Sequence, residues 1–477
     1  MSLQNYKIRD VIIKTKDGES ISVRYGLSSS FLIREDIFSP YMTAEIDIID
    51  TDGLFYSKKV NSSGNETYIS GGEEVIIQIE NYTVDKEPTV LDTINMKNNF
   101  YVDTTTPIVT KSNKQLGTLR LVTREALANE ISRVSRRYNG TIEETVKRIL
   151  QTDPECLKSK KEFNKYLNPS DYKTINKYSF IGNIEKPFDV IRKLCAKSVP
   201  IIKKGENFKT AGYFFFENLD GVYFVGIDTL LEGKLNKPLE RKYKGEEIAK
   251  GDGIPFYRYM EVVDKNVPPI MRIIDKPVIQ SRNDVLSNLL SGMYGTRIIE
   301  YDAFNFKKTE FDLILNDIYK KSMNHSVLDA YTPPEPPLKN DIDFKDRNYS
   351  RRVYRIASNH AYAKGDNIEN SFIDPNDTSR YQAESIIRTR LLFSQIVSIQ
   401  VPVNLDLRVG QIIYCQFPNA VSSGEKENRD ITDSNRMTGR YLITALCHDF
   451  SYYSGYGRFP VTKLQLVKDS YADPKVK

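Results

Sequence analysis

The residue types that carry most acid–base, nucleophilic and metal chemistry are few and scattered in this sequence. The three histidines, His325, His360 and His448, have no HxxxH or HxH spacing, and none lies near two carboxylates or cysteines at a metal-ligand interval. The four cysteines, at positions 156, 195, 415 and 447, include no CxxC pair. We therefore expect no bound metal and no cofactor.

Sequence signatures of common enzyme sites are also missing. The chain contains no GxGxxG, GxxxxGK[ST] or GxSxG motif, so phosphate-binding loops and the nucleophile elbow are not predicted. Carboxylate pairs do occur, Glu35 with Asp36 and Glu45 with Asp47, and a glycosidase needs only two well-placed carboxylates. A solvated strand edge or turn is the commoner origin of such pairs. The sequence predicts that the protein is not an enzyme.

Length and composition bound the remaining possibilities. The chain has 477 residues, of which 40% are hydrophobic and 27% charged, which is typical of globular proteins with about three or four folding units. The few cysteines favour a reducing compartment. The polar start of the sequence and the absence of an apolar run of about 18 residues predict neither general secretion nor membrane insertion. A net charge of +5 is too small to indicate a dedicated nucleic-acid binder.

Two regions, 8–110 and 381–470, alternate apolar and polar residues as strands with one wet face do. In the first region, for example, Ala44, Ile46 and Ile48 are the apolar members of one such strand. We expect the polar members of both regions to share water-facing sides of sheets: Thr43, Glu45 and Asp47 in the first region, and Ser398, Gln400, Lys463 and Gln465 in the second.

Between residues 116 and 204 the apolar spacing becomes helical, as at Leu127, Ile131 and Val134. A capping-box pattern at 141–144 and the Pro at 187 predict two further helix starts. This region contains 21 Lys and Arg against 10 Asp and Glu, a net charge of +11. Arginines on these helices form a candidate contact face for an acidic partner, with nucleic acid as the alternative: Arg120, Arg124, Arg133, Arg136 and Arg137.

A strand hairpin is predicted at 212–226, and a Pro-rich stretch at 331–337 followed by polar residues at 340–348 predicts an exposed connection. We expect five segments along the chain: a first β domain at 1–115, a helical basic insertion at 116–205, a hairpin of the second β domain at 206–232, a mixed insertion at 233–380, and the remainder of the second β domain with a C-terminal tail at 381–477.

The sequence FLIREDIFSPYMTAEIDIIDTDGL at residues 31–54, followed by Gly64-Asn65-Glu66, resembles the opening domain of the baseplate hub proteins of contractile-tailed bacteriophages. Further segments resemble later parts of that family in the same order: 212–228, 291–295 with 301–302, 406–418, 439–444 and 464–469. The order and spacing of these segments over most of the chain carry the resemblance.

This resemblance implies an α+β, mainly β fold. It implies two similar tail-tube-like antiparallel β-barrel domains with inserted helical and mixed domains, forming a pseudo-six-fold ring as a homotrimer. Related spike proteins of type VI secretion use the same hub. The chain departs from the best-known hubs in being longer, with the excess between residues 303 and 380.

In function, the resemblance implies a structural baseplate hub that adapts the six-fold tail tube to the three-fold central spike and lines the channel for DNA. The implied partners are the central spike protein, tail-tube or tube-initiator proteins, the tape-measure protein and baseplate wedge proteins. DNA is met only in transit, and no stable membrane association is expected. The implied location is the tail baseplate of the virion, after assembly in the host bacterial cytoplasm.

The resemblance also implies that the seven polar residues on the strand faces line the channel. Two similar β domains per chain would give a three-fold ring six equivalent units, which resolves the symmetry mismatch with a six-fold tube. Two alternatives stay open: a tail-associated cell-wall hydrolase, and a nucleic-acid-binding protein that uses the basic region 116–204.

Overall fold

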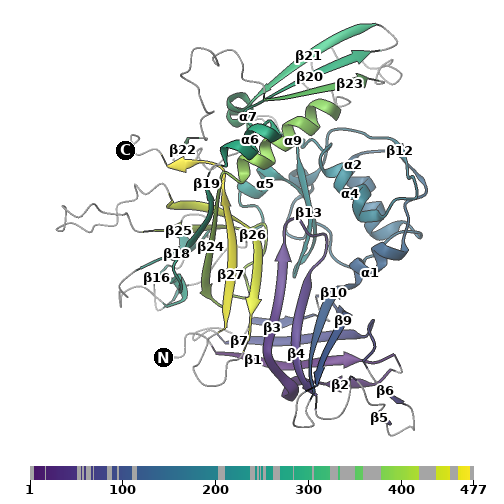
Figure 1. Cartoon of the computed structure of the whole chain (residues 1–477), viewed down its shortest axis with the longest axis vertical. Helices are drawn as coiled ribbons and strands as arrows, with labels where there is room; N and C mark the ends of the chain where they lie inside the picture. The colour runs from purple at the N-terminus through teal and green to yellow at the C-terminus, as the bar shows by residue number, and fades with distance from the viewer. Residues whose placement is uncertain are drawn as a thin grey trace, which may run out of the picture.

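The structure is a computed structural model of the full chain (Figure 1). The residues that it describes are 5–16, 18–50, 55, 59–60, 66–67, 69–82, 89–93, 96–109, 115–201, 210–236, 242–243, 246–247, 249–250, 254–260, 269–282, 284–302, 306–322, 331–332, 350–357, 378–417, 437–451 and 460–472. Most of the predicted connection at 331–348, and residues 51–54 and 64–65 of the resemblance motif, lie outside this set.

One large, mostly antiparallel sheet of 15 strands dominates the fold. Its N-terminal part contains β1 (Asn5–Lys14), β2 (Ser20–Ser22), β3 (Leu27–Asp36), β4 (Thr43–Asp50), β7 (Glu74–Tyr82), β8 (Thr89–Asp92), β9 (Phe100–Val109) and β10 (Gln115–Thr123). Its C-terminal part contains β17 (Ala249–Lys250), β18 (Ile254–Arg258), β19 (Val278–Arg282), β24 (Gln395–Pro402), β25 (Ile412–Gln416), β26 (Gly439–Asp449) and β27 (Val461–Lys468). The prediction of an α+β, mainly β chain is confirmed.

Strand β4 shows why these residues form a sheet with two unlike faces. Ala44, Ile46 and Ile48 are buried, whereas Thr43, Glu45 and Asp47 are half-buried. Successive side chains of a strand point to opposite sides, so the period of two in the sequence becomes an apolar and a polar face. The predicted alternation is confirmed on this strand.

Strand β26 joins the two parts of the sheet. Along one side it pairs with β27, and along the other it pairs first with β25 and then with β3. In this last pairing Ala445 stands opposite Asp36 and Asp449 opposite Leu32, in antiparallel register. Strands more than 400 residues apart in sequence are therefore neighbours in one continuous sheet (Figure 1).

The basic region packs beside this sheet as short helices and small ladders. It contains α1 (Arg124–Ile131), β11 (Arg137–Tyr138), α2 (Ile142–Lys147), a π-helical turn η2 (Arg148–Thr152), α3 (Pro169–Tyr172), β12 (Phe180–Ile181) and α4 (Pro187–Cys195). Both predicted helix starts, at Thr141 and at Pro187, are confirmed. The first predicted helix is wrong at its end: α1 stops at Ile131, and Val134 forms a bridge with Glu185 instead.

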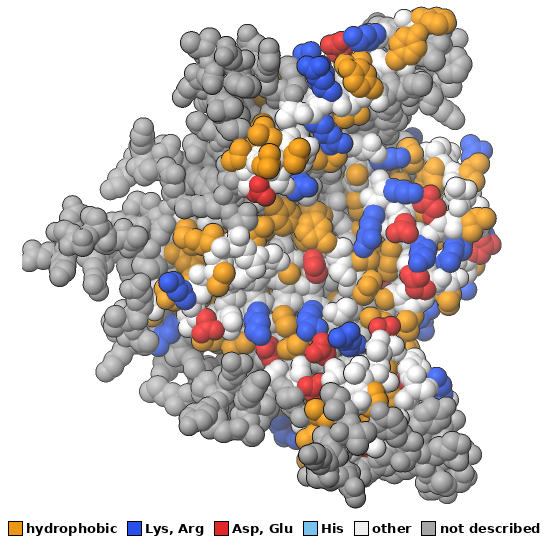
Figure 2. Space-filling view, viewed as in Figure 1, with side chains coloured by type: hydrophobic (Ala, Val, Ile, Leu, Met, Phe, Trp, Pro, Cys, Tyr) orange, Lys and Arg blue, Asp and Glu red, His pale blue; other side chains and the backbone are white. Residues whose placement is uncertain are grey.

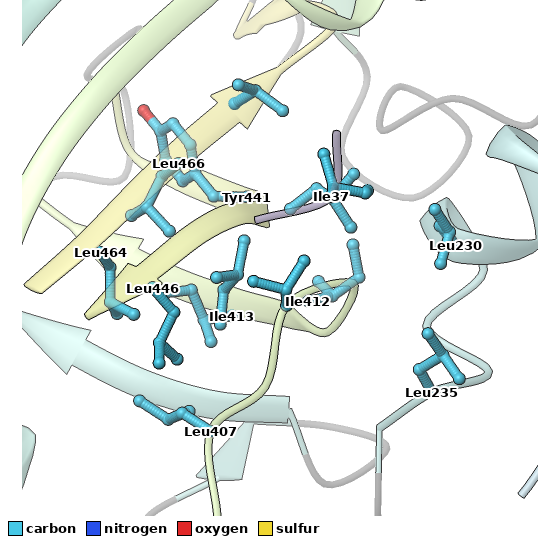
Figure 3. Close-up of a cluster of buried hydrophobic side chains, with 14 of the residues drawn as sticks. Ile37, Leu230, Leu235, Leu407, Ile412, Ile413, Tyr441, Leu446, Leu464 and Leu466 are labelled. Atoms are coloured by element: carbon cyan, nitrogen blue, oxygen red, sulfur yellow. The ribbon is translucent and has the colours of Figure 1, made fainter. Parts of the chain in front are cut away.

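The hairpin of β13 (Tyr213–Asn218) and β14 (Gly221–Gly226) forms its own two-stranded sheet, and all of its strand residues are buried. One face, with Phe216 and Tyr223, joins the core of the C-terminal part of the large sheet, and the other, with Phe215 and Phe224, joins the core of the basic region. Figure 3 shows this C-terminal core, to which Ile413, Tyr441 and Ile37 belong. The hairpin therefore holds two cores together.

A separate layer lies at the top of Figure 1. Strands β20 (Gly295–Asp302), β21 (Lys307–Ile314) and β23 (Arg351–Ala357) form a three-stranded sheet. Its inner face packs on α6 (Val285–Ser291), α7 (Leu315–Lys321) and α9 (Thr378–Leu392) through a core that includes Ile298, Leu313 and Ile387. In the described part of the chain, no helix is long and apolar enough to cross a membrane.

Candidate functional site

The polar faces of the two β regions form one continuous surface across the β26–β3 joint. On the C-terminal side, Gln400 stands opposite Lys463 and Ser398 opposite Gln465 in the β24–β27 ladder. On the N-terminal side, Thr43, Glu45 and Asp47 occupy the corresponding face of β4. Between them, the exposed side of β26 carries the small residues Ala445 and Cys447, and that of β3 carries Arg34 and Asp36.

Hydrogen bonds and ion pairs order the N-terminal half of this polar surface. Arg34 forms an ion pair with Glu45 at 3.3 Å. Asp47 accepts a 2.7 Å hydrogen bond from the hydroxyl of Thr118, and Arg120 stands opposite Glu45 on β10. The negative charges of the acidic side chains predicted to face water are thus partly balanced by cations and hydrogen-bond donors on neighbouring strands.

The C-terminal half is ordered in the same way. Gln280 of β19 donates to the hydroxyl of Ser398 at 2.7 Å and accepts from the amide of Gln465 at 3.0 Å. Lys463 forms an ion pair with Asp449 at 2.7 Å. Burial opposes ionisation of Asp449, but hydrogen bonds from Lys463 and Ser451 outweigh it and lower the pKa of this carboxyl.

A hollow of about 570 Å³ lies in the polar surface over the joint. Ala445 and Cys447 line it, and their side chains are shorter than those of the residues opposite them on β27 and β3. Burial raises the pKa of the Cys447 thiol. Five of the seven residues predicted from the strand pattern line this hollow: Thr43, Ser398, Gln400, Lys463 and Gln465. Glu45 and Asp47 continue the same face beyond it.

The five arginines of the predicted contact face do not share one element. Only Arg124 lies in a helix, where its guanidinium donates to the carbonyl of Leu157 at 3.0 Å. Arg120 lies on strand β10, on the polar surface itself. The other three, Arg133, Arg136 and Arg137, lie between α1 and α2. The prediction that all five lie on helices is wrong. The spacing of the five arginines along the sequence does not distinguish a helix from a strand or a loop.

The carboxylates of Glu35 and Asp36 point to opposite sides of β3, so they cannot act together on one substrate. Asp36 is exposed on the polar surface, whereas Glu35 is buried. Glu35 accepts hydrogen bonds from the backbone N–H groups of Leu219 and Val409, each at 3.0 Å. Burial raises its pKa to about 7, against the opposing effect of Arg408 and of these two donors. A solvated position for Glu35, as its sequence context suggested, is therefore wrong.

His448 is the one histidine among the described residues, and it is fully buried. Its Nδ1 lies 3.0 Å from the hydroxyl of Thr462, and burial together with the charge of Arg408 lowers its pKa to about 3. His325 and His360 lie outside the described residues. Within the part of the chain that the structure describes, no three His, Cys, Asp or Glu side chains gather as metal ligands would.

Arg34, Cys447 and Gln280 belong to the polar surface but were not predicted from the sequence. Arg34 could have been predicted from the sequence, because it stands two residues before Asp36 on a strand that also alternates apolar and polar residues. Cys447 had none, since its place depends on β26 pairing with β3, a segment more than 400 residues away. Gln280 depends in the same way on β19 joining β24.

No protein-family model and no curated protein sequence matches this chain. Solved structures do. A tail protein from Neisseria meningitidis MC58 is 10% identical, with 98% of each chain covered and a TM-score of 0.50. The 43 kDa tail protein of prophage MuSo2 from Shewanella oneidensis is 8% identical, with 98% of this chain and 100% of that chain covered and a TM-score of 0.47. The E. coli c3393 protein, a component of the type VI secretion system, is 10% identical, with 98% and 78% covered and a TM-score of 0.37.

Over nearly its whole length, this chain has the fold of the Neisseria tail protein. The fold that the sequence motifs implied, that of a phage-tail protein, is confirmed.

Proposed function

We propose that this protein is a structural component of a bacteriophage tail, the hub of a contractile-tail baseplate. In this role it forms a homotrimeric ring that adapts the six-fold tail tube to the three-fold central spike and lines the channel through which DNA passes. The fold of a tail protein over 98% of the chain supports the tail assignment.

The continuous polar surface is the observation that carries the channel role. It crosses from one β region to the other through the β26–β3 pairing, so one chain offers two neighbouring stretches of wall. Polar side chains on one face and a packed core on the other suit the wall of a wide hydrated tube. Because Arg34 neutralises Glu45 and Lys463 neutralises Asp449, this wall has little net charge with which to retain DNA phosphates.

The two β regions are, in this proposal, two barrel-like units of one pseudo-six-fold ring. The five segments expected from the sequence remain the working division of the chain. The hairpin at 213–226 has a structural role in this division. It joins the core of the C-terminal part of the large sheet to the core of the basic insertion. A chain that carries the tube contact twice presents six contacts from three copies, which is what a six-fold tube requires.

Exposed apolar residues support a role in assembly. One group of them lies on β19, on α6 and just before β19: Ile274, Val278, Ile279, Val285, Leu286 and Leu290. β19 is also a strand at an edge of the large sheet, and apolar edges of this kind are typical of surfaces that meet another protein. The partners that we propose are the spike, tube or tube-initiator, tape-measure and wedge proteins, within the virion tail after assembly in the host.

We propose no catalytic role. A hydrolase that used Glu35 with Asp36 would need both carboxylates on one side of β3, and they lie on opposite sides. The separated arginines likewise give little support to a continuous nucleic-acid site on 116–204.

The test is the mass of the purified full chain by light scattering, followed by cryo-electron microscopy of the assembly. The proposal predicts a trimer with contacts above about 2,000 Å² each, as obligate assemblies usually have. It also predicts that the residues around Cys447 face the central opening. A stable dimer would contradict the proposal, and so would cell-wall hydrolysis that is lost when Asp36 or Glu45 is replaced.

A further inference from the structure

The β13–β14 hairpin lies where three hydrophobic cores of the chain meet. Phe216 and Tyr223 belong to the core of the C-terminal part of the large sheet. Phe215 and Phe224 belong to the core of the basic region. Leu219, at the turn of the hairpin, is fully buried in the core of the N-terminal part of the sheet. Polar contacts made by the hairpin therefore contribute to the attachment of all three parts to one another.

On the side of the basic region, the hairpin makes its polar contact through a buried cluster of one cation and two carboxylates. Lys161 forms ion pairs with Glu217 of β13 and, at 2.6 Å, with Glu125 of α1. The hydroxyl of Thr123 donates to the other oxygen of Glu217 at 2.9 Å, and that of Ser159 donates to Glu125 at 2.7 Å. The three charged side chains, which we call the Lys161 cluster, are each at most 3% exposed.

Charges at the outer surface of the basic region are in a different situation. Figure 2 shows Lys and Arg side chains there among Asp and Glu side chains, at the right of the view. Water screens such charges. The Lys161 cluster is shielded from water, and Lys161 is the one cation that pairs with its two carboxylates among the described residues. With both carboxylates ionised, the cluster would have an uncompensated buried negative charge, so one carboxyl should hold a proton.

The carboxyl that holds this proton is that of Glu217. Burial raises its pKa to about 7, against the attraction of Lys161 and with the repulsion of Glu125. Burial also opposes ionisation of Glu125, but Lys161 outweighs burial and keeps the pKa of this carboxyl below its usual value. Burial disfavours the charge of Lys161, but the two glutamates outweigh it and raise the pKa of the ammonium. Lys161 and Glu125 therefore stay charged, and Glu217 is neutral in mild acid.

On the side of the N-terminal β region, the hairpin contacts a second cluster of the same kind. Glu35 of β3 accepts the backbone N–H of Leu219 at 3.0 Å. The Nε of Arg408 lies 3.4 Å from Asp220, at the turn of the hairpin, and 4.0 Å from Glu35, so this cation is also shared by two carboxylates. Burial raises the pKa of Glu35 to about 7 against the attraction of Arg408. We call Glu35, Asp220 and Arg408 the Arg408 cluster.

Three further titratable side chains border the Arg408 cluster. Lys165, near the surface, faces the carboxylate of Asp220. Burial raises the pKa of Tyr223 of β14, so its hydroxyl stays protonated. Burial and the neighbouring guanidinium lower the pKa of His448 of β26 to about 3, so this imidazole stays neutral. These three side chains therefore keep a constant charge between pH 5 and pH 7.

We propose that the hairpin is attached to the basic region through a proton on Glu217 and to the N-terminal β region through a proton on Glu35, so that both attachments weaken as the pH rises. When an attachment opens, its carboxyl reaches water and releases the proton, which favours opening at higher pH. The stabilisation by each proton is complete below about pH 4.3, where a solvated glutamate is itself protonated, and it is lost as the pH rises through 7. This inference goes beyond the hub role and does not depend on it.

The test is amide hydrogen exchange of the full chain between pH 5 and pH 7, with each rate divided by the intrinsic exchange rate at that pH. Opening should become about 40-fold more favourable over this range, in α1 and α4 for the basic region and in β3 for the N-terminal β region. Glu217→Gln is neutral at every pH and should abolish this change in α1 and α4 only. Glu35→Gln should abolish it in β3 only.

A second variant of the Lys161 cluster tests the charge balance itself. Glu125→Gln leaves Lys161 with one carboxylate, so Glu217 no longer needs a proton and the pH dependence of α1 and α4 should again disappear. Two exposed carboxylates give the matched controls. Glu144→Gln on α2 and Asp36→Asn on β3 should keep the wild-type pH dependence. Circular dichroism of each variant checks folding.

Three results would overturn the proposal. The first is a wild-type chain whose corrected exchange in α1, α4 and β3 does not change with pH. The second is a pH dependence of α1 and α4 that persists in both Glu217→Gln and Glu125→Gln. The third is a pH dependence that Glu217→Gln removes equally from α1 and β3, because the protons would then act on unfolding of the whole chain and not on separate attachments. The hub role is tested separately, by the mass of the assembly.

Discussion

The buried carboxylate of Glu35 accepts a 3.0 Å hydrogen bond from the backbone N–H of Val409, 374 residues later in the chain. Its other oxygen accepts an equally short bond from Leu219, at the turn of the β13–β14 hairpin. One side chain of β3 thus holds the hairpin and the segment before β25 in place. These two hydrogen bonds of Glu35 lie on the buried side of β3, and the other side of the same strand lines the hollow.

Replacing Glu35 should therefore destabilise the packing of the hairpin and of the segment before β25 against β3. Glu35→Ala leaves two buried N–H groups without an acceptor and should lower the free energy of unfolding by about 2–5 kcal/mol. The measurement is equilibrium denaturation in urea. Asp36→Ala is the control, because Asp36 is exposed and should change stability by less than about 1 kcal/mol. Equal losses of unfolding free energy in the two variants would show that the hydrogen bonds of Glu35 contribute little to stability.

The pKa of Glu35 predicts a specific pH dependence. The carboxyl of Glu35 has a pKa of about 7 in the folded protein and about 4.3 in the unfolded chain. Between about pH 4.3 and about pH 7 it is therefore protonated in the folded protein and ionised in the unfolded chain. The stabilisation is complete below about pH 4.3 and disappears as the pH rises through 7. The difference in unfolding free energy between wild type and Glu35→Gln should change by about 3 kcal/mol over this range. Parallel pH curves would contradict it.

A second buried ionic cluster attaches α9 to the large sheet. Arg388, fully buried, forms ion pairs with Asp228 at 3.1 Å and with Asp469 at 3.2 Å. Arg388→Met should cost about 3–5 kcal/mol, because it leaves two buried carboxylates without their cation. Arg390→Met, at an exposed position of the same helix, should have almost no effect. Thermal or urea unfolding of the two variants checks the contrast.

Much of the fold could be predicted from local patterns. The alternation in β4 and in β24 indicated which side chains share a face, and Pro187 marked the start of α4. These features depend on residues a few positions apart. The same patterns do not say which strands are neighbours, so the pairing of β26 with β3, and with it the hollow, was not predictable.

Burial of charge was the other feature that the sequence did not reveal. Glu35 and Asp36 are adjacent and chemically alike, yet one is buried and the other exposed, because β3 has a packed face and a polar face. The helical spacing of the region after Arg120 predicts a helix at this residue, but β10 continues to Thr123. In each case the deciding contact lies far away in the sequence.

The polar surface should tolerate the loss of its acidic charges if it faces a hydrated channel. The double variant Glu45→Gln/Asp47→Asn removes an ion pair with Arg34 and weakens a hydrogen bond from Thr118. Stability should fall by no more than about 1 kcal/mol, and the mass of the assembly should not change. Ile46→Asp, on the buried face of the same strand, should unfold the domain. Loss of assembly in the double variant would indicate that a neighbouring subunit covers this face.

Cys447 allows the orientation of the same surface to be tested chemically. Of the four cysteines, Cys156, Cys195 and Cys415 are buried, whereas Cys447 is half-buried and lines the hollow. A small maleimide should therefore modify Cys447 first in the isolated chain, more slowly than it modifies an ordinary exposed thiol because burial raises the pKa of this group. Cys447→Ser should abolish this reaction.

The informative comparison is between the isolated chain and the assembled ring. A surface that lines a water-filled channel stays accessible to a reagent small enough to enter, so the rate of modification of Cys447 should be nearly the same in both forms. A surface packed against a neighbour would be protected, and the rate would fall with assembly. Modification should also leave the mass of the ring unchanged, because a maleimide adduct in the channel displaces only water. A ring that dissociates on modification would place the subunit contact, and not the channel, at the β26–β3 joint.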